Sequence, residues 1–403
     1  MLTMREKKAL TREVVQRYQT AARREKSALL TEFVATTHYN RSYARRVLRL
    51  AQTRDLRRKK KLVRKGAKHY AGETVEFLKK YWAIANHVCG KRLHALLPEY
   101  IRVLERDHCV LPPPEVKQKL LMISAATIDR VLAPARKKIS LTKGKTATRP
   151  GTLLKHQIPV RTFADWDNVT PGFFETDLVA FCGDSLCGNF CWGLNLTDVC
   201  TGWVSLGVVW SKSANQVKDE INRLKQILPF SLKGLDADNG SEFINVILLW
   251  YTRDNFITFT RNRANKKNDN CYVEQKNYTT LRTFIGYQRL DQHEHLTILE
   301  ELLPLVELYV NFFQASTKLI HKERQGAKVS KQHDKGLTPY QRLCRSGILT
   351  KRQRKHLNKI YMSHNPLELK QKIEYLQQKL WSFSRTSSVT NLVEATNGCS
   401  VTF

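Results

Sequence analysis

Two aspartates and one glutamate stand at positions where they could share a metal ion. Asp238 follows the apolar segment 230–235 and precedes an Asn-Gly turn signal, so it falls at the end of a predicted buried strand. Asp177 lies in the middle of another predicted strand, 173–181. Glu274 opens a helical segment 36 positions after Asp238 (274 − 238), which leaves 35 residues between them. Carboxylate oxygens suit Mg²⁺ and Mn²⁺, so the three acids predict a site for either ion.

Two further acids compete for the same role. Glu175 and Asp236 each lie two residues before a predicted ligand, on the same face of its strand. The Asn-Gly-Ser sequence after Asp238 and its spacing to Glu274 favour Asp238 over Asp236. We also favour Asp177 over Glu175, which could be a neighbouring support or a ligand itself.

The three acids resemble the DDE triad of retroviral integrases and bacterial insertion-sequence transposases. The segments around them are also similar to integrase-type transposases of bacterial mobile elements, over roughly residues 1–345; the matching motifs are Pro171–Asp177, Thr197–Trp203, Lys267–Asn277 and Thr338–Arg342. This resemblance implies a ribonuclease H-like core and two Mg²⁺ or Mn²⁺ ions per active site. It also implies that the enzyme cleaves at the ends of the element to expose 3′-OH groups, and then joins those ends to target DNA.

The charge of the chain points to a polyanionic partner. Lys and Arg total 68 against 36 acids, a formal charge of +32. So large an excess favours nucleic acid, and we expect double-stranded DNA: terminal repeats and target. The apolar runs are too short to span a bilayer and the N-terminus lacks a signal-peptide core, so we expect no membrane partner and a cytoplasmic, nucleoid-associated protein of bacteria.

Composition and periodicity divide the chain into seven parts. The division is residues 1–50, a helix-turn-helix DNA-binding domain; 51–69, a basic linker; 70–139, a second helical, helix-turn-helix module; 140–158, a linker; 159–300, the catalytic core; 301–383, a basic and helical C-terminal region; and 384–403, a disordered tail.

Both helix-turn-helix patterns predict DNA contacts. In the first, the third helix carries Arg41, Arg45 and Arg46 outside its apolar face, and in the second the exposed candidates are Thr127 and Arg130. A plain helical bundle is the alternative interpretation of each. The basic linker should contact phosphates without reading sequence, through Arg57, Arg58, Lys59, Lys60 and Lys61.

The core reads as three adjacent strands followed by strands that alternate with helices. Strands are predicted near 173–181, 189–198, 203–210, 232–238 and 256–260, and helices near 213–227, 241–254 and 270–285, with Ser241 as a helix cap. This order predicts an α/β core, preceded by all-α modules and followed by a helical region, and the resemblance implies that the core is of the ribonuclease H-like type.

Basic residues around Glu274 are candidates for holding DNA phosphates near the metals. They are Arg261, Arg263, Lys266, Lys267, Lys276 and Arg282. Related transposases commonly carry a basic residue seven positions after the glutamate. Here that position is Leu281, and Arg282 comes one residue later.

The sequence therefore predicts a DNA transposase that works by two-metal-ion phosphoryl transfer. Because two DNA ends must be brought together, we expect at least a dimer on DNA. Two alternatives remain open: a catalytically silent DNA-binding regulator derived from a transposase, and another ribonuclease H-like nuclease.

Overall fold

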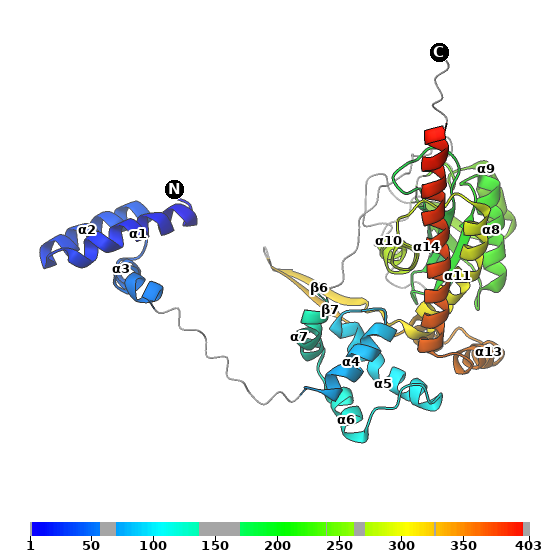
Figure 1. Ribbon diagram of the computed structural model, residues 1–403, viewed down its shortest axis with the longest axis horizontal. Helices are drawn as coiled ribbons and strands as arrows, with labels where there is room; N and C mark the ends of the chain where they lie inside the picture. The colour runs from blue at the N-terminus through cyan, green and yellow to red at the C-terminus, as the bar shows by residue number, and fades with distance from the viewer. Residues whose placement is uncertain are drawn as a thin grey trace, which may run out of the picture. The chain divides into compact units, whose positions relative to one another are not determined.

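The computed structural model describes residues 2–56, 70–136, 170–238, 240–261, 271–325 and 328–397. The chain falls into two compact units, Met1–His69 and Tyr70–Phe403 (Figure 1). Each unit has its own apolar core.

The first unit is a set of three helices, as its periodicity predicts. They are α1 (Met4–Thr20), α2 (Arg23–Thr37) and α3 (Arg41–Leu56). A capping box between Thr3 and Glu6 starts α1, and a left-handed His38 (φ 55°) ends α2. The small core that holds them consists of Val15, Leu30, Phe33, Ala44 and Leu48. The third helix runs six residues further than expected, to Leu56.

The second unit opens with four helices that share a core with the rest of that unit. They are α4 (Glu73–Ile84), α5 (Gly90–Arg106), α6 (Pro114–Met122) and α7 (Ala125–Arg136). Tyr100 on α5 donates a hydrogen bond to the carbonyl of Phe313 (2.7 Å), and Tyr309 donates one to the carbonyl of Ile84. The helices predicted as a separate module, 70–139, therefore lie in one compact unit with the sheet.

A five-stranded mixed sheet forms the centre of the second unit. Its strands are β1 (Phe173–Ala180), β2 (Trp192–Asp198), β3 (Val204–Val209), β4 (Gly234–Ala237) and β5 (Thr258–Arg261), in the order β3-β2-β1-β4-β5. The strand β2 is antiparallel to both of its neighbours, β1 and β3. On the other side of the sheet, β4 is parallel to β1, and β5 is parallel to β4. All five lie within the predicted segments or within one residue of them. The order and directions are compatible with a ribonuclease H-like core.

Helices cover this sheet and connect its parallel strands. They are α8 (Ala214–Ile227), α9 (Val246–Asp254), α10 (Cys271–Asn277), the π-helical turn η3 (Tyr278–Arg282) and α11 (His293–Phe313). α8 and α11 contact β3, whereas α10 contacts β1 and β2. Gly193 on β2 permits this approach, because a Cβ there would meet Leu281 at 3.0 Å.

The helix after β4 begins later than the sequence predicts. Residues 241–245 form turns, and α9 begins at Val246 with Asn245 as its cap, whose side chain accepts from the Leu248 amide at 2.9 Å. Ser241 is therefore not the cap. Phe243 and Ile244 are buried in the turn, which delays the helix by one turn.

The C-terminal region consists of a hairpin and three helices. They are β6 (Leu319–Gln325), β7 (Lys328–His333), α12 (Pro339–Arg345), α13 (Lys351–Met362) and α14 (Pro366–Asn397). α14 packs along α11 (Figure 1). The tail expected from 384 continues this helix to Asn397, since no Gly or Pro interrupts the segment after Pro366. Among the described residues, no helix is both long and apolar enough to cross a membrane.

Candidate active site

Asp177, within β1, and Asp238, directly after β4, lie side by side on neighbouring parallel strands. The register of β1 with β4 pairs Thr176 with Ala237, so the two aspartates are the next residues in line. The Asp238 carboxylate accepts a hydrogen bond from the amide of Gly240 at 2.8 Å, which closes the turn after β4. The strand register thus brings two of the three predicted acids together.

A chain of side-chain amides connects Asp177 to the helix that carries Glu274. Asn277 on α10 donates to Oδ2 of Asp177 at 2.7 Å, and its own carbonyl oxygen accepts from Nδ2 of Asn195 on β2 at 2.8 Å. The amide of Leu178 donates to Oδ1 of Asp177 at 2.8 Å. Glu274 precedes Asn277 by three residues, on an exposed part of the same helix. Asn277 therefore fixes α10 against β1, and with it the place from which Glu274 extends.

The electrostatics of this region show that its acids are close. Burial, followed by the nearby negative charges of Asp238, Glu274 and Glu242, raises the pKa of Asp177 to about 8. Burial also raises the pKa of Asp238, although the Lys212 ammonium acts in the opposite direction. Asp177 therefore favours its protonated form at neutral pH unless positive charge arrives beside it.

Glu242 is a fourth acid at this site, and the sequence interpretation missed it. Its side chain is buried, and neither carboxylate oxygen has a hydrogen-bond partner among the described residues. A Cβ at Gly240 would lie 2.6 Å from its carboxyl carbon and 2.9 Å from Oδ1 of Asp238, so only glycine fits between the two acids. Burial and then Asp238 raise the pKa of Glu242. The sequence predicts position 242 in the first turn of a helix, and that prediction gives no sign that the Glu242 side chain is buried.

Glu175 and Asp236 form a second pair of acids on the same two strands, each two residues before an acid of the first pair. They are register partners across β1 and β4. The Glu175 side chain accepts from the amide of Val273 at 2.7 Å, so it anchors the start of α10, and its other oxygen is buried without a partner among the described residues. Asp236 accepts a hydrogen bond from the Thr260 hydroxyl. Both acids thus support neighbouring elements from inside the sheet.

The donor set consists of oxygens, which fits a hard divalent cation. The unpartnered carboxylate of Glu242 beside Asp238 is a further sign of fit, because a buried carboxylate without hydrogen bonds needs positive charge or a proton. Within the described part of the chain, however, no three His, Cys, Asp or Glu side chains approach closely enough to enclose an ion. Glu274 lies on α10, where its residue is exposed.

Two of the basic residues predicted around the acids belong to α10 and the π turn. Arg282 is half-buried, with its guanidinium 5.8 Å from the Phe181 ring centre and 4.7 Å from that of Tyr287. Burial lowers the pKa of Arg282, and nearby Asp177 opposes that shift. A π turn holds one residue more than an α turn, so Arg282 lies about where the seventh residue after Glu274 would lie on a regular helix. Lys276 has other cations as its electrostatic neighbours, not the acids.

The remaining predicted DNA contacts are scattered over the chain. Arg261 is half-buried beside the last residue of β4, whereas Arg41, Arg45 and Arg46 are exposed on α3. On α7, Arg130 donates to the Thr127 hydroxyl at 3.0 Å. The other predicted contacts lie outside the described residues: Arg57, Arg58, Lys59, Lys60 and Lys61 in the basic linker, and Arg263, Lys266 and Lys267 before α10.

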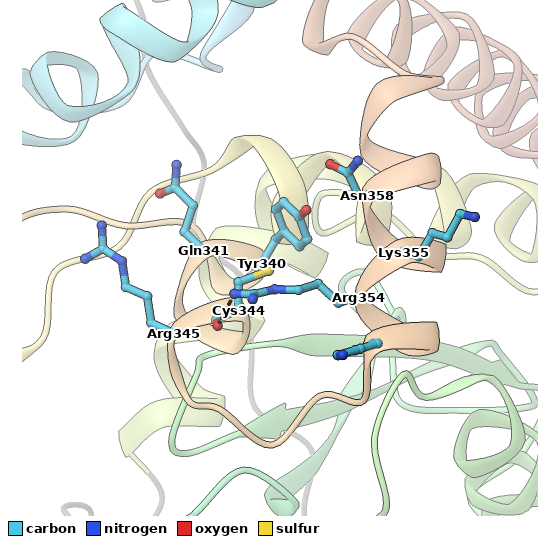
Figure 2. Close-up of a pocket in the computed structure, with 8 residues that line it drawn as sticks. Tyr340, Gln341, Cys344, Arg345, Arg354, Lys355 and Asn358 are labelled. Atoms are coloured by element: carbon cyan, nitrogen blue, oxygen red, sulfur yellow. Dashed lines mark hydrogen bonds between the residues drawn. The ribbon is translucent and has the colours of Figure 1, made fainter.

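A cation-lined cavity lies between α12 and α13. It has a volume of about 610 Å³, and Figure 2 shows Arg354 reaching across it toward Cys344, whose carbonyl accepts from the guanidinium at 2.8 Å. Lys351, Lys355 and Arg345 also line it, and its lining contains no acid. Sequence reasoning did not select these residues, although six Lys, Arg or His residues and no acid within α13 were a signal.

The sequence of this chain is 36% identical to a protein of Sinorhizobium fredii (strain NBRC 101917 / NGR234) described as "Uncharacterized protein y4rM", over 343 residues. The match covers 85% of this chain and 96% of that relative. The two proteins belong to one family. No family model matches the chain. The match covers nearly the whole relative, but because that protein is described as uncharacterized, it assigns no activity to this chain.

Among solved structures, the chain is similar to the catalytic core domain of BIV integrase. The match has a TM-score of 0.28 and 17% sequence identity, and it covers 47% of this chain and 98% of that domain. At that TM-score the likeness carries no weight for the fold. The strand order and register of this chain are themselves compatible with a ribonuclease H-like core.

Proposed function

We propose that this protein is a DNA transposase that cleaves at the ends of a mobile element and joins the exposed 3′-OH ends to target DNA. The observation that carries the proposal is the pairing of Asp177 with Asp238 on adjacent parallel strands, with the Glu274 helix tied to Asp177 through Asn277. The net charge of +32 supports a polyanionic substrate.

Asp177, Asp238 and Glu274 are the proposed holders of two Mg²⁺ or Mn²⁺ ions, with Glu242 as an added carboxylate. When bound, such ions activate the attacking oxygen and stabilise the leaving oxygen of an in-line phosphoryl transfer. The chain itself contributes orientation: Asn277 holds Asp177 and the Gly240 amide holds Asp238. Both are neutral donors, so they position the carboxylates and leave their charge available.

DNA recognition is assigned to the helical parts of the chain. We propose that Arg41, Arg45 and Arg46 read the terminal repeats, that Thr127 and Arg130 contact DNA from α7, and that the 57–61 cations bind phosphates. The cavity between α12 and α13 is a further candidate for backbone contact, because its cations have no acid among them (Figure 2). The proposed assembly on DNA is at least a dimer, in the bacterial cytoplasm with the nucleoid.

The test is strand cleavage of a plasmid that carries the coding region with its flanking genomic DNA. Full-length protein with Mg²⁺ should nick or cut the flanks, and Asp238→Asn should abolish cleavage while DNA binding persists. Asp184→Asn is the matched control, because Asp184 is exposed in a turn. Full cleavage by the Asp238 variant would refute the proposed site. Repeat binding without any cleavage by the wild type would favour the silent regulator.

A further inference from the structure

A cavity lies where the helices of residues 70–136 meet the back of the Glu274 helix. Its volume is about 380 Å³, which is within the range of roughly 300–1,000 Å³ that ligand pockets show. Trp82, Arg92 and Arg136 line it from α4, α5 and α7, and Lys276 and Tyr278 line it from α10 and η3. The cavity thus joins two parts of the chain that the sequence treats as separate modules.

The polar lining of this cavity is cationic. Arg92, Arg136 and Lys276 face it, and none of the described lining residues is acidic. Within the described part of the chain, the side chains of Arg92 and Lys276 form no hydrogen bond or ion pair. Arg136 bonds Asp129 through one guanidinium nitrogen at 3.0 Å, but its Nη2 is buried and has no partner among the described residues. The site therefore holds more positive charge than its surroundings neutralise.

Lys276 shows the consequence most clearly. The charged groups that act on its ammonium are the cations Arg92, Arg342 and Lys318. Of these neighbours, Arg342 is already paired with Asp334 and Lys318 with backbone carbonyls. An anion in the cavity would supply the counter-charge that the described lining residues do not give Lys276.

The cavity also offers aromatic surface. The Tyr278 side chain is 51% exposed, and the buried Trp82 lies against His87 with ring centres 4.5 Å apart. Aromatic faces that stand beside cations bind unpaired nucleotides, because the bases stack and the phosphates meet the charges. A cavity of this volume is too small for a duplex.

We propose that this cavity binds one nucleotide of a single-stranded DNA segment, with its phosphate at Arg92, Arg136 and Lys276 and its base against Tyr278. The proposal rests on the proposed function, which supplies DNA as the substrate. Lys276 and Tyr278 follow Glu274 by two and four residues, so a strand held here lies against the helical segment that carries Glu274. The helices of residues 70–136 then complete a binding site together with α10.

The test measures binding of full-length protein to a fluorescent ten-nucleotide oligo(dT) in EDTA, so that no cleavage is needed. Lys276→Met should weaken this binding at least about tenfold, as expected for the loss of one charge-assisted hydrogen bond. The dependence of log affinity on log salt should also fall by about 0.7. Lys372→Met, an exposed lysine of α14, is the matched control and should bind as the wild type does.

Thermal stability separates a binding role from a structural one. Because the Lys276 side chain forms no hydrogen bond or ion pair among the described residues, Lys276→Met should melt at the same temperature as the wild type. A lower melting temperature together with weaker binding would overturn the proposal, as would unchanged oligo(dT) binding. A 5-iodouracil oligonucleotide should crosslink at Tyr278, and crosslinking confined to other residues would also overturn it. Oligo(dT) binding by a protein that never cleaves DNA would refute the proposed function and leave this site standing.

Discussion

Replacing Asp177 by Asn should raise the stability of the metal-free protein relative to the wild type as the pH rises, from slightly lower at pH 4 to higher at pH 8. The reason is the pKa of Asp177, which is about 8 in the folded chain against 3.8 for an ordinary aspartate. Between these two values the folded state keeps a proton that the unfolded state has lost. Asp177 therefore makes the wild type lose stability as the pH rises from about 4 to about 8, and the Asn variant lacks this contribution.

The size of the effect follows from the same shift. About four pKa units at 1.36 kcal/mol each set a ceiling of roughly 6 kcal/mol. Water that reaches the half-buried carboxyl screens part of the repulsion, so we expect the stability difference to widen by about 2 kcal/mol between pH 4 and pH 8. The amide of Asn can still accept from Asn277 but not also from Leu178, which costs about 1 kcal/mol at every pH.

The assay is urea unfolding in EDTA, followed by tryptophan fluorescence at several pH values. All 7 tryptophans lie after residue 81, so the signal reports the second unit alone. Adding Mn²⁺ at 100 times its Kd should stabilise the wild type by about 2.7 kcal/mol and leave the variant largely unchanged.

Two results would refute this reasoning. A stability difference that stays constant from pH 4 to pH 8 would show that the acids do not repel one another in the folded chain. An equal gain from Mn²⁺ in both proteins would show that Asp177 is not a ligand. Asp184→Asn serves as the control, and its stability should follow the wild type at every pH.

Three other perturbations test the remaining assignments. Asn277→Ala should slow cleavage and cost about 1–3 kcal/mol of stability, since it leaves buried polar groups of Asp177 and β2 without their partner; cleavage kinetics and urea unfolding check this. Ala at all of positions 57–61 should flatten the salt dependence of DNA binding by about four or five units without loss of selectivity, which a salt titration on repeat and scrambled duplexes checks. Replacing Arg45 and Arg46 by Ala should instead reduce discrimination between those duplexes by about 1–3 kcal/mol for each arginine that hydrogen-bonds a base edge.

The sheet could be predicted from the sequence because each strand carries its own local signal. The segments around Phe174 and Leu235 are apolar and end at turn residues, which is enough to place their strands to within a residue or two. The side-by-side position of Asp177 and Asp238 follows from strand order. Glu242 could not be found in this way, because its burial depends on a turn that packs against the sheet rather than on periodicity.

The shared core of the second unit also left no local signal. The four helices of residues 70–136 have ordinary amphipathic patterns, which fit a free-standing bundle equally well. What joins them to the sheet is contact between residues far apart in the chain, such as Tyr100 with Phe313. Lys276 illustrates the same limit, since only the folded chain shows that its neighbours are Arg92 and other cations.

These contacts between residues far apart in the chain affect the order in which its parts can fold on the ribosome. The core residues described for the first unit lie between Leu10 and Leu48, so this core can form as soon as α3 has emerged. Tyr100 must wait for a partner 213 residues further on, which at 5–20 residues per second takes roughly 10–40 s. During that interval the helices of residues 70–136 lack the surface that buries them. The nascent chain thus presents a finished N-terminal unit well before the proposed active site is complete.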